Sequence, residues 1–211
     1  MKLNLPNKLT LARMIMVPFL MVFITFDFGL GMWSRLIAAG FFALASATDF
    51  LDGYLARRDN LVTNFGKFMD PLADKLMVFV ALISLCYVTG RDTVYYNFFG
   101  ELIVDKAERI YGVCLLAVTV IVIFRELAVT SMRMVVTNTD GVVIAANWLG
   151  KVKTCVQIVF ILTALIEPMF DYDVLGGHVA SYITMTTMAV LTLWSGFVYF
   201  KGYWKYINPS V

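Results

Sequence analysis

Six stretches of about twenty mostly apolar residues follow one another along this chain, and each is long enough to cross a bilayer core as a helix. Hydrophobic residues make up 60% of the sequence and charged residues 15%, whereas soluble domains have about 45–50% and about 25%. We therefore expect an all-α integral membrane protein with a short N-terminal interfacial segment, forming one transmembrane domain over residues 1–211. The six predicted transmembrane helices cover 9–28, 34–57, 65–88, 110–135, 148–166 and 181–200.

The distribution of basic residues predicts how these helices are oriented. Six crossings place both termini on one side, and that side receives 13 of the 17 Lys and Arg residues. Loops rich in Lys and Arg stay in the cytoplasm, so we expect cytoplasmic termini and a multi-pass protein of the cell membrane. The longest connection, 89–109, falls on the far side and is expected to hold a short interfacial helix. His178, beside two glycines on that side, is interpreted as a loop histidine.

Four aspartates interrupt this apolar chain near its predicted cytoplasmic face. Asp49 and Asp52 are spaced i, i+3 at the end of the second predicted helix, and Asp70 and Asp74 are spaced i, i+4 at the start of the third. Each pair shares one helix face, so the two pairs can converge. Clustered carboxylates repel one another, and a hard cation such as Mg²⁺ removes that repulsion. Two such ions could clamp the oxygens of a phosphoryl displacement.

Neighbouring residues suit a diphosphate ligand, although two other interpretations remain open on these grounds. Arg57 can contact phosphate in bidentate fashion, Gly53 and Gly66 allow close approach to the backbone, and Ala56 keeps space open. One alternative is a structural ion-pair network with the nearby cations. The other is a cation-transport site, because acids inside membranes often mark ion paths.

The spacing Asp49-x2-Asp52-Gly53-x2-Ala56-Arg57-x8-Gly66-x3-Asp70-x3-Asp74 closely resembles the signature of the CDP-alcohol phosphotransferase family, with eight residues matched over 26 positions. The resemblance implies a membrane enzyme with six transmembrane helices, usually a homodimer, that joins an alcohol to the phosphatidyl group of CDP-diacylglycerol and releases CMP. It implies two Mg²⁺ ions per site, or Mn²⁺ in their place, bound by the four aspartates. It also makes Asp74 the general base. Gly53, Ala56, Arg57 and Gly66 would shape the CDP site.

The identity of the acceptor alcohol depends on other residues. Arg125 and Arg133 are eight apart near the end of the fourth predicted helix, and Lys151 and Lys153 begin the fifth. Several cations at the mouth of such a site suggest an acceptor that carries a phosphate. The alternative is anchoring of helix ends at the membrane surface, which we favour for Lys153. Glu126 is interpreted as a structural partner of one of the arginines.

The segments LPNKLTLAR, RELAVTSMR and GKVKT resemble the bacterial branch of the family that makes phosphatidylglycerophosphate. That resemblance implies sn-glycerol 3-phosphate as acceptor, with its phosphate held by Arg125, Arg133 and Lys151. It also places Asn7 and Thr10 at the CDP-lipid site, together with Arg13. Helix capping by Asn7 or Thr10 and snorkelling of Arg13 to the interface are the alternatives.

Rival functions follow from the same residues. A cardiolipin synthase would use phosphatidylglycerol as acceptor, and another branch of the family would use an inositol phosphate. A divalent-cation transporter would need the acids without Gly53, Ala56, Arg57 and Gly66, and a purely structural subunit would tolerate Asp→Asn at all four aspartates. No feature of the sequence suggests a nucleic-acid partner.

Overall fold

The computed structural model describes residues 5–26, 28–58, 64–92, 94–96, 102–104, 106–140, 148–170 and 178–207. Within these ranges, the side chains of residues 5–6, 50–58, 64–68, 70, 92, 94–96, 102–104, 135–140 and 205–207 are not described.

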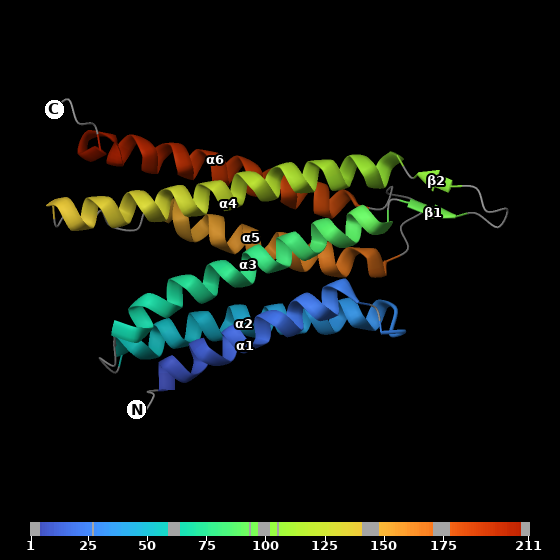
Figure 1. Cartoon of the computed structure of the whole chain (residues 1–211), viewed down its shortest axis with the longest axis horizontal. Helices are drawn as coiled ribbons and strands as arrows, with labels where there is room; N and C mark the ends of the chain where they lie inside the picture. Colours follow the sequence, from blue (N-terminus) through green and yellow to red (C-terminus); the bar gives the residue numbers. More distant parts are fainter. Residues whose placement is uncertain are drawn as a thin grey trace.

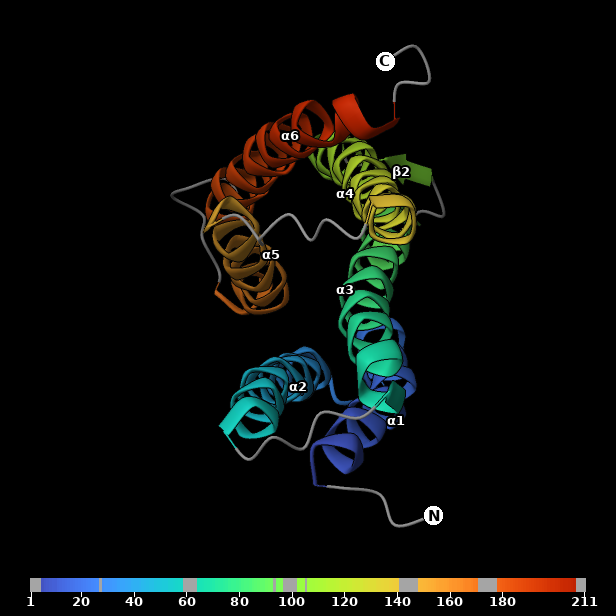
Figure 2. The same ribbon diagram turned by 90° about the vertical axis from the view of Figure 1, so that its left-hand side faces the viewer.

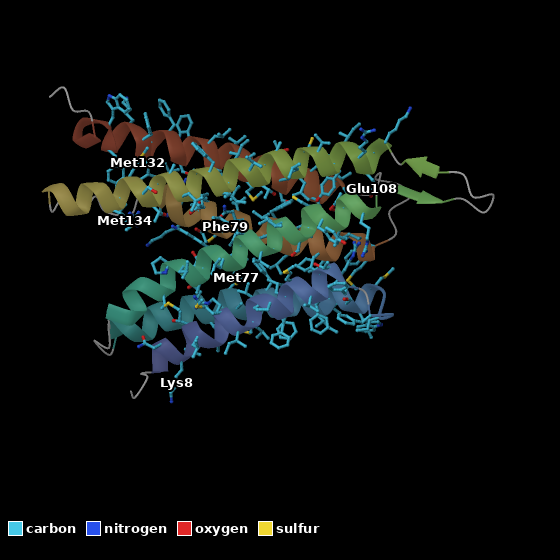
Figure 3. All side chains as sticks on the ribbon, in the orientation of Figure 1. Lys8, Met77, Phe79, Glu108, Met132 and Met134 are labelled. Atoms are coloured by element: carbon cyan, nitrogen blue, oxygen red, sulfur yellow. The ribbon has the colours of Figure 1, made fainter. Side chains whose placement is uncertain are left out.

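Six long helices dominate the described chain, as the apolar runs predict. They run side by side in alternating directions, so that α1 begins and α6 ends at the same end of the bundle (Figure 1). We call this the terminal end, and the opposite one the hairpin end. Figure 3 shows Lys8 at the terminal end and Glu108 at the hairpin end. The helices are α1 (Leu5–Thr25), α2 (Met32–Arg58), α3 (Asn64–Asp92), α4 (Lys106–Asp140), α5 (Trp148–Ile166) and α6 (Val179–Ile207).

Five of the six helices are long and apolar enough to cross a membrane, so the chain is a multi-pass membrane protein. The exception among the described helices is α2, whose 27 residues give a length of about 40 Å. Arg35, Asp49 and several small polar residues lower its hydropathy. The outer surface of the bundle carries large apolar side chains such as Phe124 and Phe197, which are 74% and 66% exposed. Such a surface suits lipid tails rather than water.

The structure corrects two expected features. The first helix ends at Thr25 rather than at residue 28, because Phe28, Gly29 and Gly31 adopt positive φ in the turn that follows. Ser34 closes this turn, because its hydroxyl hydrogen is shared between two carbonyl oxygens near the end of α1, which lie 2.7 and 3.0 Å from Oγ. The expected interfacial segment before the first helix stays a prediction. α1 is continuous from Leu5, and residues 1–4 are not among the described residues.

The second correction concerns the 89–109 connection. Between the end of α3 and the start of α4, its described residues form two strands and not the expected interfacial helix. Strands β1 (Val94–Tyr96) and β2 (Leu102–Val104) pair antiparallel there, with Tyr95 opposite Ile103. Five of the six strand residues are aromatic or β-branched, and these residue types favour strands over helices.

The apolar core occupies the hairpin half of the bundle, which leaves the terminal half for polar chemistry. Figure 2 shows α1, α2 and α3 grouped on one side and α4, α5 and α6 on the other. Contacts between α3 and α4 and between α2 and α5 join the two groups. The core includes Leu20, Ala38, Phe42, Ala81, Leu82, Phe160, Ile161 and Met188.

At the hairpin end, an ion pair links the start of α6 to α4. His178 lies 2.6 Å from Glu108, from its Nε2 to the carboxylate Oε1, and its ring stacks on Tyr111 at 4.6 Å between centroids. The hydrogen bond to Glu108 raises the pKa of His178 above its ordinary value, against the opposing effect of burial. The interpretation of His178 as a residue outside the helices is confirmed, and its side chain tethers two helices.

We expect this pair to make stability depend on pH. Because the pKa of His178 is raised by folding, its contribution is complete below a pH of about 6.5 and is lost as the pH rises through the raised pKa. His178→Phe keeps a ring against Tyr111 but removes the charge. The variant should be less stable than the wild type at pH 5.5 by about 0.5–1 kcal/mol, because the pair is partly exposed. Thermal melts at pH 5.5 and pH 9 check this: an equal difference at both pH values would contradict it.

Candidate active site

An ion pair, buried on its arginine side, joins α1 to the aspartate signature on α2. Arg13 is completely buried, and its Nη1 donates to Oδ1 of Asp49 at 2.5 Å. The Asp49 side chain is 39% exposed, so it can contact a ligand while the hydrogen bond from the buried Arg13 fixes its orientation. The snorkelling alternative for Arg13 is therefore wrong, because a buried guanidinium bound to an aspartate does not reach the interface.

Asp74 lies where the two groups of helices meet. It is close enough to Asp49 and Arg13 on one side, and to Lys153 and Glu126 on the other, for each to act on it electrostatically. These partners come from α2, α1, α5 and α4. Asp74 on α3 thus faces Asp49 on α2 and also the polar residues of the second group of helices.

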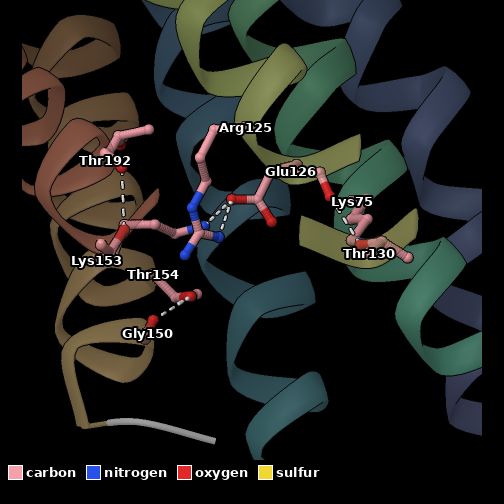
Figure 4. Close-up of polar contacts among 9 residues, drawn as sticks. Lys75, Arg125, Glu126, Thr130, Gly150, Lys153, Thr154 and Thr192 are labelled. Carbon is pink, nitrogen blue, oxygen red and sulfur yellow. Dashed lines mark hydrogen bonds and ion pairs between the residues drawn. The ribbon is translucent and has the colours of Figure 1, made fainter. Parts of the chain in front are cut away.

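Glu126 is the centre of an ion cluster between α4 and α5. Its Oε1 accepts a hydrogen bond from Nη1 of Arg125 at 3.0 Å and another from Nζ of Lys153 (Figure 4). Lys153 is only 3% exposed, so its interpretation as a surface anchor is wrong. The expectation that Glu126 pairs with a neighbouring arginine is confirmed. A second cation also reaches the carboxylate, because Lys153 lies on the inner face of α5.

Lys75, the residue after Asp74, ties α3 to the same cluster. Its ammonium donates to the hydroxyl of Thr130 on α4, which in turn donates to the carbonyl oxygen of Glu126 at 2.7 Å (Figure 4). Lys75 also lies within electrostatic range of Glu126, Asp74, Arg133 and Arg125. This link holds α3 and α4 together at the level of Asp74.

The Arg125 side chain is nine-tenths buried, and only some of its guanidinium donors have partners among the described residues. Nη1 binds Glu126, and the guanidinium carbon lies 5.4 Å from the centre of the Tyr199 ring. Its Nε and Nη2 are buried without a hydrogen-bond partner among the described residues. These two donors form one edge of the guanidinium, the edge that binds carboxylate or phosphate in bidentate fashion. Arg125 is thus oriented by Glu126, with a free binding edge.

Several predicted site residues have described backbones but no described side chains. Their backbones lie in the last turns of α2 and the first turns of α3, as the sequence predicts. These residues are Asp52, Gly53, Ala56, Arg57, Gly66 and Asp70. Their proposed roles therefore stay predictions.

The remaining predicted residues are placed as follows. Asn7 and Thr10 are buried on α1 on the same side as Arg13, and both lie inside the helix rather than at its cap. Arg133 is exposed on α4 but within electrostatic range of Lys75. Lys151 is exposed and lines a mostly apolar groove between α5 and α6. Its acceptor role stays a prediction, and Lys153 is the lysine that reaches Glu126.

The described carboxylates fit a divalent cation by their chemistry. Asp49 and Asp74 lie close enough to repel each other, and both offer only oxygen ligands, which hard cations such as Mg²⁺ prefer. No three described His, Cys, Asp or Glu side chains form a cluster, but two of the four predicted ligands are outside that set. Asp52 and Asp70 would complete the ligands from the same two helices.

Two polar residues escaped the sequence analysis. Gln157 on α5 is 2% exposed and Thr192 on α6 is fully buried. Each carries a side-chain atom without a hydrogen-bond partner in the described part of the chain. A usable signal was present, because Gln157 follows Lys153 by four residues in an otherwise apolar run and so shares its face.

Comparison with known proteins gives a consistent result. The family model of the CDP-alcohol phosphatidyltransferases matches residues 3–194. A protein of Bacillus subtilis (strain 168), named CDP-diacylglycerol–glycerol-3-phosphate 3-phosphatidyltransferase, is 37% identical over 216 aligned residues that cover 98% of each chain. Proteins with the same name from Yersinia enterocolitica and Sodalis glossinidius are 34% and 35% identical and cover 97% and 94% of each chain.

Proposed function

The chain belongs to the CDP-alcohol phosphatidyltransferase family, and on this premise we propose that it transfers the phosphatidyl group of CDP-diacylglycerol to sn-glycerol 3-phosphate. The products are phosphatidylglycerophosphate and CMP. Relatives named for this reaction match nearly the full length of the chain. The position of Asp74 carries the proposal, because it lies between Asp49 on one side and Lys153 and Glu126 of the ion cluster on the other.

The reaction we propose is an in-line displacement at phosphorus. A hydroxyl oxygen of the acceptor attacks the lipid-side phosphorus, a new P–O bond forms, and the P–O bond to CMP breaks. Asp74 takes the hydroxyl proton as general base. Lys75 and Thr130 fix the adjoining turn of α3 against α4, which keeps the Asp74 carboxylate at one depth in the bundle.

Members of the family generally depend on a divalent metal ion. In this chain Asp49, Asp52, Asp70 and Asp74 would hold two Mg²⁺, or Mn²⁺ in their place. When bound, such ions neutralise charge that develops on the phosphate oxygens. Arg13 orients Asp49 through its 2.5 Å hydrogen bond. The CDP group would lie along Gly53, Ala56, Arg57 and Gly66, with Asn7 and Thr10 at its edge.

The acceptor phosphate would bind on the α4 side of the site. Arg125 supplies the free guanidinium edge, and Arg133 and Lys151 add positive charge toward the terminal end. A glycerol 3-phosphate held there would present a hydroxyl group toward Asp74. A phosphate-free acceptor would leave the buried edge of Arg125 unsatisfied, which is unfavourable.

The remaining parts of the proposal concern the membrane. Six transmembrane helices, including α2, would place the terminal end and its active site in the cytoplasm, because 13 of 17 Lys and Arg residues lie toward that side. The chain would act as one transmembrane domain and as a homodimer. The acyl chains of CDP-diacylglycerol would extend from the site into the bilayer.

Acceptor-dependent release of CMP tests the function. Purified protein in detergent would receive CDP-diacylglycerol and Mg²⁺ with glycerol 3-phosphate, phosphatidylglycerol or an inositol phosphate. We expect CMP release only with glycerol 3-phosphate and none after chelation with EDTA. Release with phosphatidylglycerol would instead favour a cardiolipin synthase. Absence of release with all three acceptors, from folded protein that binds Mg²⁺, would favour the cation-transport alternative.

A further inference from the structure

Three residues near the Glu126 cluster carry buried donor groups that no described residue accepts. They are Nε and Nη2 of Arg125, Nε2 of Gln157 and Oγ1 of Thr192. Buried donors without a partner are rare in folded proteins. The other described threonines with bonds on α6, such as Thr187, donate to a carbonyl one turn earlier. Thr192 makes no such bond, so its hydroxyl is available to a ligand.

The packing of α5 against α6 places Gln157 and Thr192 on the facing sides of the two helices, both toward the hairpin end from one shared contact. A Cβ at Gly150 would lie 3.3 Å from the hydroxyl oxygen of Tyr199, so the tip of the Tyr199 side chain reaches α5 at Gly150. Seven residues further along α5 is Gln157, and seven residues back along α6 is Thr192. The helices are antiparallel and in contact (Figure 1). Seven residues are about two turns, so each side chain lies on the face of its helix that carries this contact, about two turns toward the hairpin end.

Arg125 lies about one turn from Thr192. A Cβ at Gly196 would lie 3.2 Å from Cγ of Arg125, and Thr192 is one turn before Gly196. Gln157 is likewise one turn after Lys153, which binds the same carboxylate as Arg125. Figure 4 shows Thr192 and Lys153 on the same side of Arg125. The free donors of α4, α5 and α6 therefore converge on one small region.

The chemistry of these groups indicates the kind of ligand. All four atoms can donate hydrogen bonds, and one of the three side chains is permanently cationic. A ligand that satisfies them must accept several hydrogen bonds and carry negative charge. A phosphate monoester does both through its three terminal oxygens. A neutral hydroxyl group could accept hydrogen bonds from two of these donors at most, and it carries no negative charge.

We propose that Gln157 and Thr192 form, with Arg125, a buried cradle for the phosphate of the acceptor and so determine the preference for phosphorylated acceptors. The proposal rests on the proposed function and assigns two further binding residues to it. Glu126 and Lys153 act as positioning residues, since Glu126 binds Nη1 of Arg125 and leaves the opposite edge for the ligand.

Steady-state kinetics of CMP release, with each substrate varied in turn, tests the cradle. Gln157→Leu and Thr192→Val should each raise the KM for glycerol 3-phosphate about tenfold or more, because each removes a hydrogen bond to a charged group. The KM for CDP-diacylglycerol should stay within about twofold. Thr192→Ser, which keeps the hydroxyl, should resemble the wild type. Thr186→Val is the matched control, because Thr186 is exposed on α6 and its hydroxyl already donates to the carbonyl oxygen of Tyr182.

Binding of inorganic phosphate gives a second test that does not require turnover. At constant ionic strength, phosphate should raise the Tm of the wild type and of Thr186→Val in the absence of CDP-lipid and metal. It should raise the Tm of Gln157→Leu much less, and that of Gln157→Glu not at all, since the new carboxylate repels phosphate. An equal rise in all variants, or equal changes in both KM values, would overturn the cradle.

Failure of the proposed function is distinguishable from failure of the cradle. If the wild type used only a phosphate-free alcohol, the proposed function would be wrong. The phosphate-dependent Tm shift would still decide whether these residues bind phosphate. If Gln157→Leu failed to fold, the comparison of Thr192→Val with Thr192→Ser would decide the same question.

Discussion

Replacing Asp74 by asparagine is expected to lower kcat for CMP release by about 10²- to 10⁴-fold, the usual contribution of a positioned general base. Asparagine keeps the size of the side chain but cannot accept the hydroxyl proton. The fold should survive, because Asp74 lies in a polar part of the bundle and its neighbours Arg13, Lys153 and Glu126 have other partners. The KM for glycerol 3-phosphate should change little if Asp74 acts mainly in the chemical step.

Single-turnover and steady-state rates of the purified variant would measure this effect. Glu108→Gln is a suitable control, since it removes a carboxylate at the hairpin end (Figure 3). The control should retain nearly full activity. Asp74→Asn with more than about a tenth of wild-type kcat would contradict the role as base. Full rescue by excess Mg²⁺ would show instead that Asp74 acts only through metal binding.

The general architecture was accessible from the sequence because hydropathy and charge are averaged over many residues. Apolar runs predicted all six helices, and 11 of the 12 predicted ends lie within about five residues of the observed ones. The exception is the end of α6. The aspartate pairs lie where the spacing predicts, near the end of α2 and the start of α3. Turn geometry was less accessible: the positive φ of Phe28 ends α1 before the apolar run ends. The hairpin was missed because its strands have three residues each.

Contacts of single side chains could not be predicted as well, and α5 shows why. Lys151 and Lys153 are two residues apart and therefore point about 200° apart on a helix, so only one can face the interior. The sequence favoured Lys151 for the site, whereas the structure buries Lys153 and exposes Lys151. Gln157 and Phe160 lie on the same buried face as Lys153. Their spacing indicates that face, but only when the pattern of the whole helix is considered.

Removing the carboxylate of Glu126 should have the largest effect on stability. Glu126→Leu would leave Lys153 and Arg125 buried next to each other without a compensating charge. Breaking a buried ion pair from one side typically costs about 3–5 kcal/mol. For a chain of this size that corresponds to a fall in Tm of roughly 6–20 °C. Thermal unfolding in detergent would measure it, and a fall of less than about 2 °C would contradict the cluster.

A double variant separates the stability of the cluster from its function. Glu126→Leu with Lys153→Met removes one cation along with the carboxylate, so most of the lost Tm should return, because replacing a buried ion pair by apolar residues is often neutral. Arg125 would still lack the hydrogen bond to its Nη1 that orients it. The KM for glycerol 3-phosphate should therefore stay raised although the protein is stable again. Recovery of both properties together would mean that Glu126 only compensates charge, and that Arg125 needs no positioning residue to bind phosphate.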